Sequence, residues 1–414
     1  MADKLGGEQS ESSRECFDVV IAGAGIVGSA LALALASLEA ERPLRIALVE
    51  PRAPEPWSPD IFGRRVVALN ESSRLLLEEI GVWPSVIERR ACPYKKMKVR
   101  DREGIGAIDF DCAESGLSEL GYIVESALIV DSLSTAIADN SAVTRYQPNE
   151  IVDIDESRSD RIGVELSDRC LTASLLVAAD GARSPTRALC GFKVREWDYG
   201  HSAIVATVSG EKPHDFTAWQ WFSPAGPLAF LPLRGADGDC HSVSIVWSQK
   251  TAQSEMLMAD SDEAFCRALG IASEHVLGDI RQVSARAVFP LRQCHATDYV
   301  KSSVALVGDA AHTIHPLAGL GVNLGLSDVQ TLAEEIGQAP TTGEIGSKFL
   351  LHRYQRRRKP ENLAVMAAME GFKRLFEREE LPLKWLRNFG MRQVDGLAPL
   401  KQLIVRQATG GHSH

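Results

Sequence analysis

Three glycines at a fixed spacing form the most informative chemical pattern in this chain of 414 residues. Gly23, Gly25 and Gly28 follow an apolar segment, 17–22, and precede a segment rich in Ala and Leu. In such a turn the first glycine makes the reversal, the second lets a pyrophosphate approach the backbone, and the third lets a helix pack closely on a strand. Glu50 comes 22 residues after Gly28, where its carboxylate can accept hydrogen bonds from a ribose. The pattern predicts a dinucleotide site without separating NAD from FAD.

Two later turns also carry a carboxylate directly after an apolar run. Asp180 ends the run 175–179, and Gly308 with Asp309 ends the run 304–307. Ligands of open α/β sheets bind at the carboxyl ends of the strands, so both acids are candidate ligands of the same site. The alternative is that each aspartate caps a helix, which is a common role for an aspartate at a strand end.

The elements that must position these residues can be read from the same pattern. Strands are expected over 17–22, 45–50, 175–180 and 304–309, and the glycine turn opens a helix that Pro43 ends. Residues 19–38 carry no charge and could span a membrane by length, but their order of strand, turn and helix indicates a buried βα unit instead.

Residues 196–282 have a different sequence pattern. Short β-type runs recur there and predict an antiparallel sheet laid over the reactive end of the site, with an apolar pocket between them. Trp219 and Trp221 would share one face of a strand.

Composition excludes several classes of protein. The net charge of -10 argues against a protein that wraps nucleic acid. The eight cysteines form no CxxC pair, so we expect thiols in a reducing compartment and no metal site. Residues 347–414 hold 14 Lys and Arg against 6 Asp and Glu, a net +8, and alternate apolar and basic residues. This tail fits either a helical cap on the main body or a segment that contacts an anionic membrane.

Several runs of residues together resemble a known family, the flavin-dependent aromatic hydroxylases of the p-hydroxybenzoate hydroxylase superfamily. The closer resemblance is to the ubiquinone-biosynthesis hydroxylases of the UbiH/UbiF/VisC type. The glycine turn, the Asp-Gly segment and the late Gly-Asp segment carry the general resemblance. The runs that carry the closer one are 65–70, 77–83, 121–125, 229–233, 244–247, 307–323, Tyr354 with Arg358, and 371–376.

The resemblance implies a set of cofactor contacts. The ADP half of FAD would be held by the glycine turn and Glu50, the flavin side reached by Arg65, and the ribityl chain bound by Asp309. Pro316 would lie beside the ring, and the backbone amides that follow would face it. Ser126 departs from the asparagine that this family commonly carries there. The residues assigned to FAD are Gly23, Gly25, Gly28, Glu50, Arg65, Asp180, Gly308, Asp309, Pro316, Gly319, Gly321, Val322 and Asn323.

The same resemblance implies a reaction. FAD reduced by transient NADPH or NADH would take up O2 as a flavin C4a-hydroperoxide, whose distal oxygen passes to the aromatic ring of a polyprenylated phenol in ubiquinone biosynthesis. The alternatives are a hydroxylase of a soluble aromatic compound and a non-catalytic FAD-binding partner subunit. No catalytic base is assigned, because His312 and His315 fit backbone-bonded loop histidines as well as a base.

The predicted architecture is α/β, a Rossmann-like FAD-binding domain with an inserted, mainly antiparallel substrate sheet and a C-terminal helical region. Residues 1–16 form a disordered lead-in. The FAD-binding domain comprises 17–88, 117–195 and 283–345, the substrate domain comprises 89–116 and 196–282, and the basic helical region comprises 346–414. The protein is expected in the cytoplasm, with its tail peripheral on the inner face of the membrane. Contacts with other ubiquinone-biosynthesis proteins and with a second copy stay open.

Overall fold

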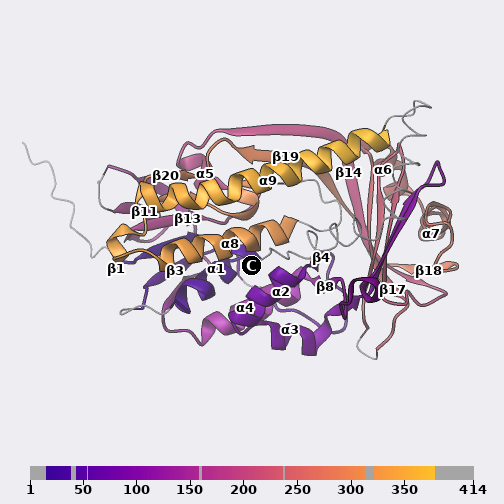
Figure 1. Ribbon diagram of the computed structural model, residues 1–414, viewed down its shortest axis with the longest axis horizontal. Helices are drawn as coiled ribbons and strands as arrows, with labels where there is room; N and C mark the ends of the chain where they lie inside the picture. Colours follow the sequence, from indigo (N-terminus) through magenta and orange to yellow (C-terminus); the bar gives the residue numbers. More distant parts are fainter. Residues whose placement is uncertain are drawn as a thin grey trace, which may run out of the picture.

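The computed structural model describes residues 15–38, 43–53, 55–157, 161–235, 238–313 and 321–377. Its centre is a six-stranded sheet in the order β20-β21-β13-β2-β3-β9, parallel except at β20 (Figure 1). Strands buried on both faces are continuous apolar runs, as the sequence shows for all four predicted strands. The strands are β20 (Val300–Lys301), β21 (Val304–Leu306), β13 (Leu175–Ala178), β2 (Val19–Ala22), β3 (Ile46–Val49) and β9 (Val143–Tyr146).

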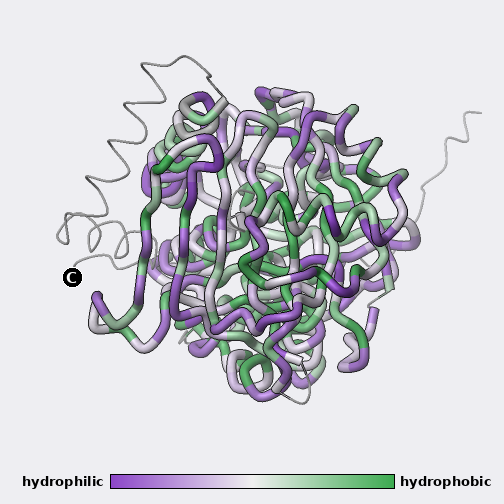
Figure 2. The backbone as a smooth tube through the Cα atoms, turned by 90° about the vertical axis from the view of Figure 1, so that its right-hand side faces the viewer, coloured by the Kyte–Doolittle hydropathy of each residue, from purple (hydrophilic) through white to green (hydrophobic). Residues whose placement is uncertain are grey.

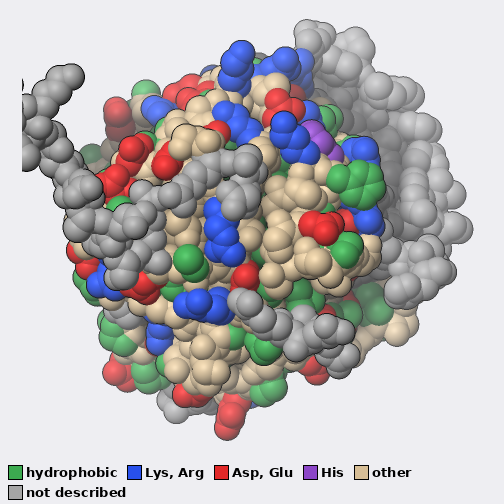
Figure 3. All heavy atoms as spheres, turned by 90° about the vertical axis from the view of Figure 1, so that its left-hand side faces the viewer, with side chains coloured by type: hydrophobic (Ala, Val, Ile, Leu, Met, Phe, Trp, Pro, Cys, Tyr) green, Lys and Arg blue, Asp and Glu red, His purple; other side chains and the backbone are tan. Residues whose placement is uncertain are grey.

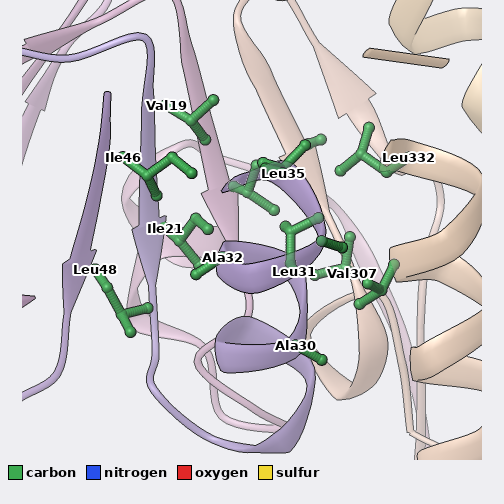
Figure 4. Packing of buried hydrophobic residues seen from close by; sticks show 14 of the residues in the cluster. Val19, Ile21, Ala30, Leu31, Ala32, Leu35, Ile46, Leu48, Val307 and Leu332 are labelled. Atoms are coloured by element: carbon green, nitrogen blue, oxygen red, sulfur yellow. The ribbon is translucent and has the colours of Figure 1, made fainter. Parts of the chain in front are cut away.

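Helices cover this sheet and complete its core. α1 (Ile26–Ala36) packs between β2 and β3 on one side and α8 (Gly321–Gly337) on the other, and Leu31 and Leu35 fill the space (Figure 4). The helix was predicted to run to Pro43 but ends at Ala36, with Ser37 as its C-cap, whose hydroxyl bonds back to the Leu33 carbonyl at 2.9 Å. The remaining helices of this part are α2 (Glu71–Glu79), α3 (Trp83–Arg90), α4 (Ser126–Ala138) and α5 (Pro185–Leu189).

A nine-stranded, mainly antiparallel sheet stands at one end of the molecule, on the right in Figure 1. Apolar segments gather inside this end and polar ones at its rim (Figure 2). Residues 196–282 form most of it, so the predicted inserted sheet is confirmed. The strands are, in spatial order, β22 (His312–Thr313), β19 (Ala287–Ala296), β14 (Val194–Gly210), β17 (Ser242–Lys250), β16 (Leu228–Pro232), β15 (Thr217–Phe222), β6 (Lys96–Asp101) and β7 (Ala107–Asp111), with β18 (Ile280–Val283) beside β14.

The two faces of this sheet have different partners. α6 (Thr251–Ala259) packs at β14 and β17, and α7 (Asp262–Ala272) shares an apolar core with the face that carries Trp221 and Ile245. Trp219 and Trp221 share that face, as predicted, and their rings stack with centroids 5.5 Å apart. Leu231 and Val246 point the other way and pack with a small sheet, β4-β8-β5. Its strands are β4 (Val66–Leu69), β8 (Gly121–Glu125) and β5 (Cys92–Tyr94).

The last described helix spans both parts. α9 (Lys348–Glu377) begins beside α8 and β20 and ends at the nine-stranded sheet, where Phe376 stacks on Phe222 of β15 (Figure 1). β19 and β22 also join that sheet, although they lie in the 283–345 segment assigned to the FAD-binding domain. The domain boundaries stay a prediction. A fourth sheet consists of β1 (Glu15–Cys16), β12 (Cys170–Ala173), β11 (Ile162–Leu166) and β10 (Ile151–Asp155).

Candidate functional site

One edge of the parallel sheet gathers the predicted turns. Ala22 pairs in register with Val49 and Ala178, and Ala178 pairs with Leu306. The residues that directly follow these paired positions therefore lie at the same edge of the sheet, next to one another. The sheet thus brings together the glycine turn, Glu50, Asp180 and the Gly308 turn, which are up to 285 residues apart in sequence.

The glycine turn leaves open space where a phosphate would lie. Gly23 has φ +101°, and a Cβ there would lie 2.6 Å from the Ala179 carbonyl oxygen. A Cβ on Gly28 would lie 1.9 Å from the Gly23 oxygen. Gly25, in contrast, has nothing within 4 Å of a Cβ position, and as the N-cap of α1 it supplies no side-chain bond to the helix N–H groups. This open, uncapped helix start fits the pyrophosphate of FAD.

The Glu50 carboxylate is held at the same turn. It accepts hydrogen bonds from the Ala24 N–H at 2.9 Å and the Arg52 N–H at 3.2 Å. A carboxylate fixed by two backbone donors keeps lone pairs for further donors, such as ribose hydroxyls.

Asp180 lies against the glycine turn, but its observed partners belong to a helix start. Its carboxylate accepts from the Ser184 hydroxyl and from the Thr186 N–H at 3.0 Å, and Ser184 caps α5. These bonds are those of the capping alternative. A contact between Asp180 and FAD stays a prediction.

The late turn brings a second pair of candidates together. Asp309 lies in a short 3-10 turn, Gly308–Ala310, in which Gly308 has φ +58°. Burial raises the pKa of Asp309, and the nearby charges of His312 and Arg65 act in the opposite direction. Arg65 is exposed, sits 5.7 Å from the Phe289 ring, and has its carbonyl bound by the Ser126 N–H at 2.9 Å. The charge of Arg65 thus acts on Asp309, which places the two predicted cofactor residues in the same part of the molecule.

The start of α8 follows that turn. The Asn323 amide is not free for a ligand, because it accepts from the Asn70 N–H and the Ser73 hydroxyl and donates to the Ala68 carbonyl at 2.8 Å. Only its backbone could face a flavin. Gly321 and Val322 open the helix beside it. Pro316, Gly319 and His315 lie outside the described residues.

A buried ion pair near Arg65 was not predicted. Arg90 Nε donates to Glu125 at 2.7 Å, and both side chains are at most 4% exposed. Glu125 also accepts from the Trp57 indole and the Gly63 N–H, and Arg90 donates to the carbonyls of Pro59 and Ile61. The pair fixes the 57–63 loop that leads into Arg65. The sequence did carry one signal for this pair, because Glu125, like Glu50, comes at the end of an apolar strand.

The described residues contain neither a candidate metal centre nor a candidate membrane span. Within those ranges no group of three or more His, Cys, Asp or Glu could hold a metal ion. Among the described helices, none has the length and apolar content needed to cross a bilayer.

Comparison with known proteins identifies the family of this chain. The FAD binding domain family matches residues 16–369. The fold resembles p-nitrophenol 4-monooxygenase from Pseudomonas putida, with a TM-score of 0.76 and 19% identity over 97% of this chain and 100% of that one. It also resembles PqsL of Pseudomonas aeruginosa, a probable FAD-dependent monooxygenase, with a TM-score of 0.73 and 21% identity over 92% of this chain and 100% of that one. The family match defines an FAD-binding protein, and the fold is the one that these monooxygenases share.

Sequence relatives narrow this class. The chain is 32% identical to the ubiquinone biosynthesis monooxygenase COQ6 of Xenopus tropicalis, over 99% of this chain and 97% of the relative. It is 34% identical to the 3-demethoxyubiquinol 3-hydroxylase of Escherichia coli, over 95% and 98%, and 33% identical to the ubiquinone hydroxylase UbiL of Rhodospirillum rubrum, over 98% and 92%. The chain belongs to the family of FAD-dependent ubiquinone-biosynthesis hydroxylases.

Proposed function

We propose that this protein hydroxylates the aromatic ring of a polyprenylated phenol in ubiquinone biosynthesis, using O2 and NADH or NADPH. The observation that carries the proposal is the match to ubiquinone hydroxylases along nearly the full length of both chains. Bound FAD supplies the activation of O2 that the reaction needs. The protein's own contribution is to orient the ring and to exclude water.

The cofactor contacts are proposed for the residues that the sheet edge gathers. The open start of α1 at Gly25 would bind the pyrophosphate, and the held carboxylate of Glu50 the adenosine ribose. Asp309 would bind the ribityl chain. Its carboxylate has no hydrogen-bond partner among the described side chains and amides, which leaves it available to a hydroxyl-rich ligand.

The phenol ring would lie between that edge and the nine-stranded sheet. The sheet face opposite α7 is the one turned to the β4 sheet, and Leu231 and Val246 give it an apolar character. Phe289, 38% exposed, reaches Arg65 from the same sheet. An apolar face with one arginine nearby suits a phenol that carries a polyprenyl chain.

The deciding experiment has two parts. Purified protein should be yellow, and NADH or NADPH should bleach its flavin absorbance. Removal of the gene should cause a prenylated quinone precursor lacking one ring hydroxyl to accumulate, as measured by mass spectrometry of lipid extracts. A protein that binds no flavin, or a quinone pool that stays unchanged after gene removal, would contradict the proposal. Flavin reduction with an unchanged quinone pool would favour a soluble aromatic substrate.

We also propose that the protein works in the cytoplasm, peripherally on the membrane that holds its substrate. The described basic residues of α9 are engaged within the protein. Arg357 pairs with Glu334 and Glu335, Arg358 is buried, and Lys359 bonds to the Thr297 carbonyl. On the left-hand end of Figure 1, where α9 begins, acidic and basic side chains are interspersed (Figure 3). The membrane contact is therefore assigned to residues 378–414, which lie outside the described residues.

This assignment is tested with vesicles. The full chain should co-sediment with liposomes that contain anionic lipid and should lose this binding when residues 378–414 are deleted, with the flavin content unchanged. Equal sedimentation of both proteins would contradict it.

A further inference from the structure

A cluster of buried polar side chains lies directly behind the Gly308 turn. Asp328 of α8, which is 0% exposed, is its centre. One carboxylate oxygen accepts from the Gly308 N–H at 3.0 Å and from His312 Nε2 at 2.6 Å. The other accepts from Arg358 Nε at 2.8 Å and from the Asn362 amide at 3.3 Å, both on α9. Asp328 thus connects α9 to the turn that carries Asp309.

The charge state of this cluster is set by its neighbours. Burial disfavours the carboxylate form of Asp328, but the charges and hydrogen bonds of His312 and Arg358 outweigh burial and lower its pKa. Asp328 is therefore ionised at neutral pH. Buried ion pairs are costly, and well-packed apolar residues of similar volume often stabilise a fold as well or better. A role beyond holding α8 against α9 would account for the cost.

The geometry points to that role. Gly308 adopts a left-handed conformation, and Val27 of α1 lies 3.2 Å from its Cβ position, so the turn has little room to shift toward α1. The Asp328 carboxylate accepts a hydrogen bond from the Gly308 N–H and so restrains the same residue a second time. The direction in which the next residue, Asp309, leaves the turn follows from these two restraints.

We propose that Asp328 is a positioning residue for the flavin site: it fixes the Gly308 turn so that Asp309 meets the ribityl chain, and Arg358 and Asn362 fix Asp328 from α9. The proposal rests on the proposed contact between Asp309 and FAD. It gives the Tyr354-x-x-x-Arg358 stretch of α9 a function in cofactor binding rather than in membrane or partner contact.

The alternative is that the cluster only holds α9 on the body. Arg357 offers a matched control, because it is the adjacent residue of α9 and pairs with the same helix, α8, at Glu334 (2.6 Å) and Glu335 (3.0 Å). Its partners lie two turns along α8 from Asp328. Loss of the Arg357 or the Asn362 side chain weakens the α8–α9 contact, but only Asn362 is bonded to Asp328 and so to the residue that holds Gly308.

The experiment compares D328N, N362A and R357A in the full chain. For each, the apoprotein is titrated with FAD to obtain Kd, the flavin midpoint potential is measured in the reconstituted protein, and the apoprotein Tm is recorded. D328N should raise the Kd for FAD at least about tenfold, by analogy with the loss of affinity when residues that orient metal ligands are replaced. It should also shift the midpoint potential. N362A should change the Kd for FAD and the midpoint potential in the same direction as D328N, but by less. R357A should lower Tm and leave the Kd and the midpoint potential unchanged.

Unchanged Kd and potential in D328N and N362A would overturn the proposal, as would a shift in R357A equal to theirs at equal loss of Tm. If D328N does not fold, N362A against R357A decides the question. Wild-type protein that fails to bind FAD would instead contradict the proposed function, so the two failures can be told apart.

Discussion

The glycines of the first motif differ in function: we expect Gly23 to be required for the fold of the turn and Gly25 to be required for cofactor binding. Substitution of each by alanine should separate the two effects. Gly25→Ala should leave the free energy of unfolding within about 0.5 kcal/mol of wild type, because φ is -73° and nothing lies within 4 Å of the new methyl group. That methyl group should obstruct the pyrophosphate and raise the Kd for FAD at least about tenfold, or 1.4 kcal/mol. Urea unfolding of the apoprotein and FAD titration separate the two effects.

Gly23→Ala is the matched comparison. The new Cβ would meet the Ala179 carbonyl oxygen at 2.6 Å in a backbone conformation that disfavours side chains, at a cost of about 2–4 kcal/mol. Equal apoprotein stability for the two variants would show that the glycine turn is not built as described.

The buried histidine beside Tyr299 should make the fold sensitive to acid. Burial, with the nearby charges of His312, Lys359 and Arg195, lowers the pKa of His295 from 6.5 to about 4. The unfolded chain binds this proton below pH 6.5 and the folded chain does not, so stability falls as pH drops from about 6.5 toward 4, by up to about 3 kcal/mol. In His295→Gln the free energy of unfolding should change less with pH across that range. His352→Gln, at an exposed position on α9, should leave the dependence of the unfolding free energy on pH as it is in the wild type.

At the scale of elements, the 57–63 loop depends on one ion pair. Arg90→Ala should cost about 3–5 kcal/mol, because it leaves the Glu125 carboxylate buried without its counter-charge. Arg281→Ala is the control, since both side chains of its pair with Glu211 are at least 47% exposed and the pair should contribute about 1 kcal/mol or less. Chemical unfolding gives both values, and limited proteolysis should cut the loop only in the Arg90 variant. Similar costs for the two variants would contradict this account.

The contact between α1 and α8 is set by a glycine. A Cβ on Gly325 would lie 2.6 Å from Val27 Cγ2 and 3.3 Å from the Gly308 Cα. Alanine is the better helix former, yet Gly325→Ala should destabilise the protein by about 1–3 kcal/mol through overpacking. Val27→Ala removes the first contact, so in a double-mutant cycle the second substitution should recover part of the loss. Strict additivity would contradict the contact.

At the scale of the whole molecule, α9 ties the two large sheets together. Phe376 is buried and its ring stacks on Phe222 at 4.3 Å, while Tyr199 of β14 bonds to Glu370. Phe376→Ala should cost about 1 kcal/mol for the ring pair beyond the apolar burial that is lost. It should also broaden or split the calorimetric unfolding transition. Phe349→Ala, on the same helix but 73% exposed, should change little. A single sharp transition in the Phe376 variant would contradict this role of α9.

The sequence by itself determined the local units and the family. Strand, turn and helix follow one another within 30 residues around Gly23, so hydrophobic period and glycine spacing suffice to predict them, as they do for the strands before Asp180 and Asp309. The antiparallel sheet was predictable as a class, because its runs recur over one continuous stretch. The family resemblance, confirmed by the comparisons, supplied the cofactor.

Tertiary structure alone decided which distant groups meet. Register placed the four turns on one edge, and strand order took β6, β7, β19 and β22 into the nine-stranded sheet. The Arg90 pair with Glu125 and the bonds of Asp328 with Gly308 and Arg358 join residues 20 to 35 positions apart. No short-range pattern predicts such pairs, because the packing of distant elements, and not the spacing in the chain, determines which buried charges lie next to each other.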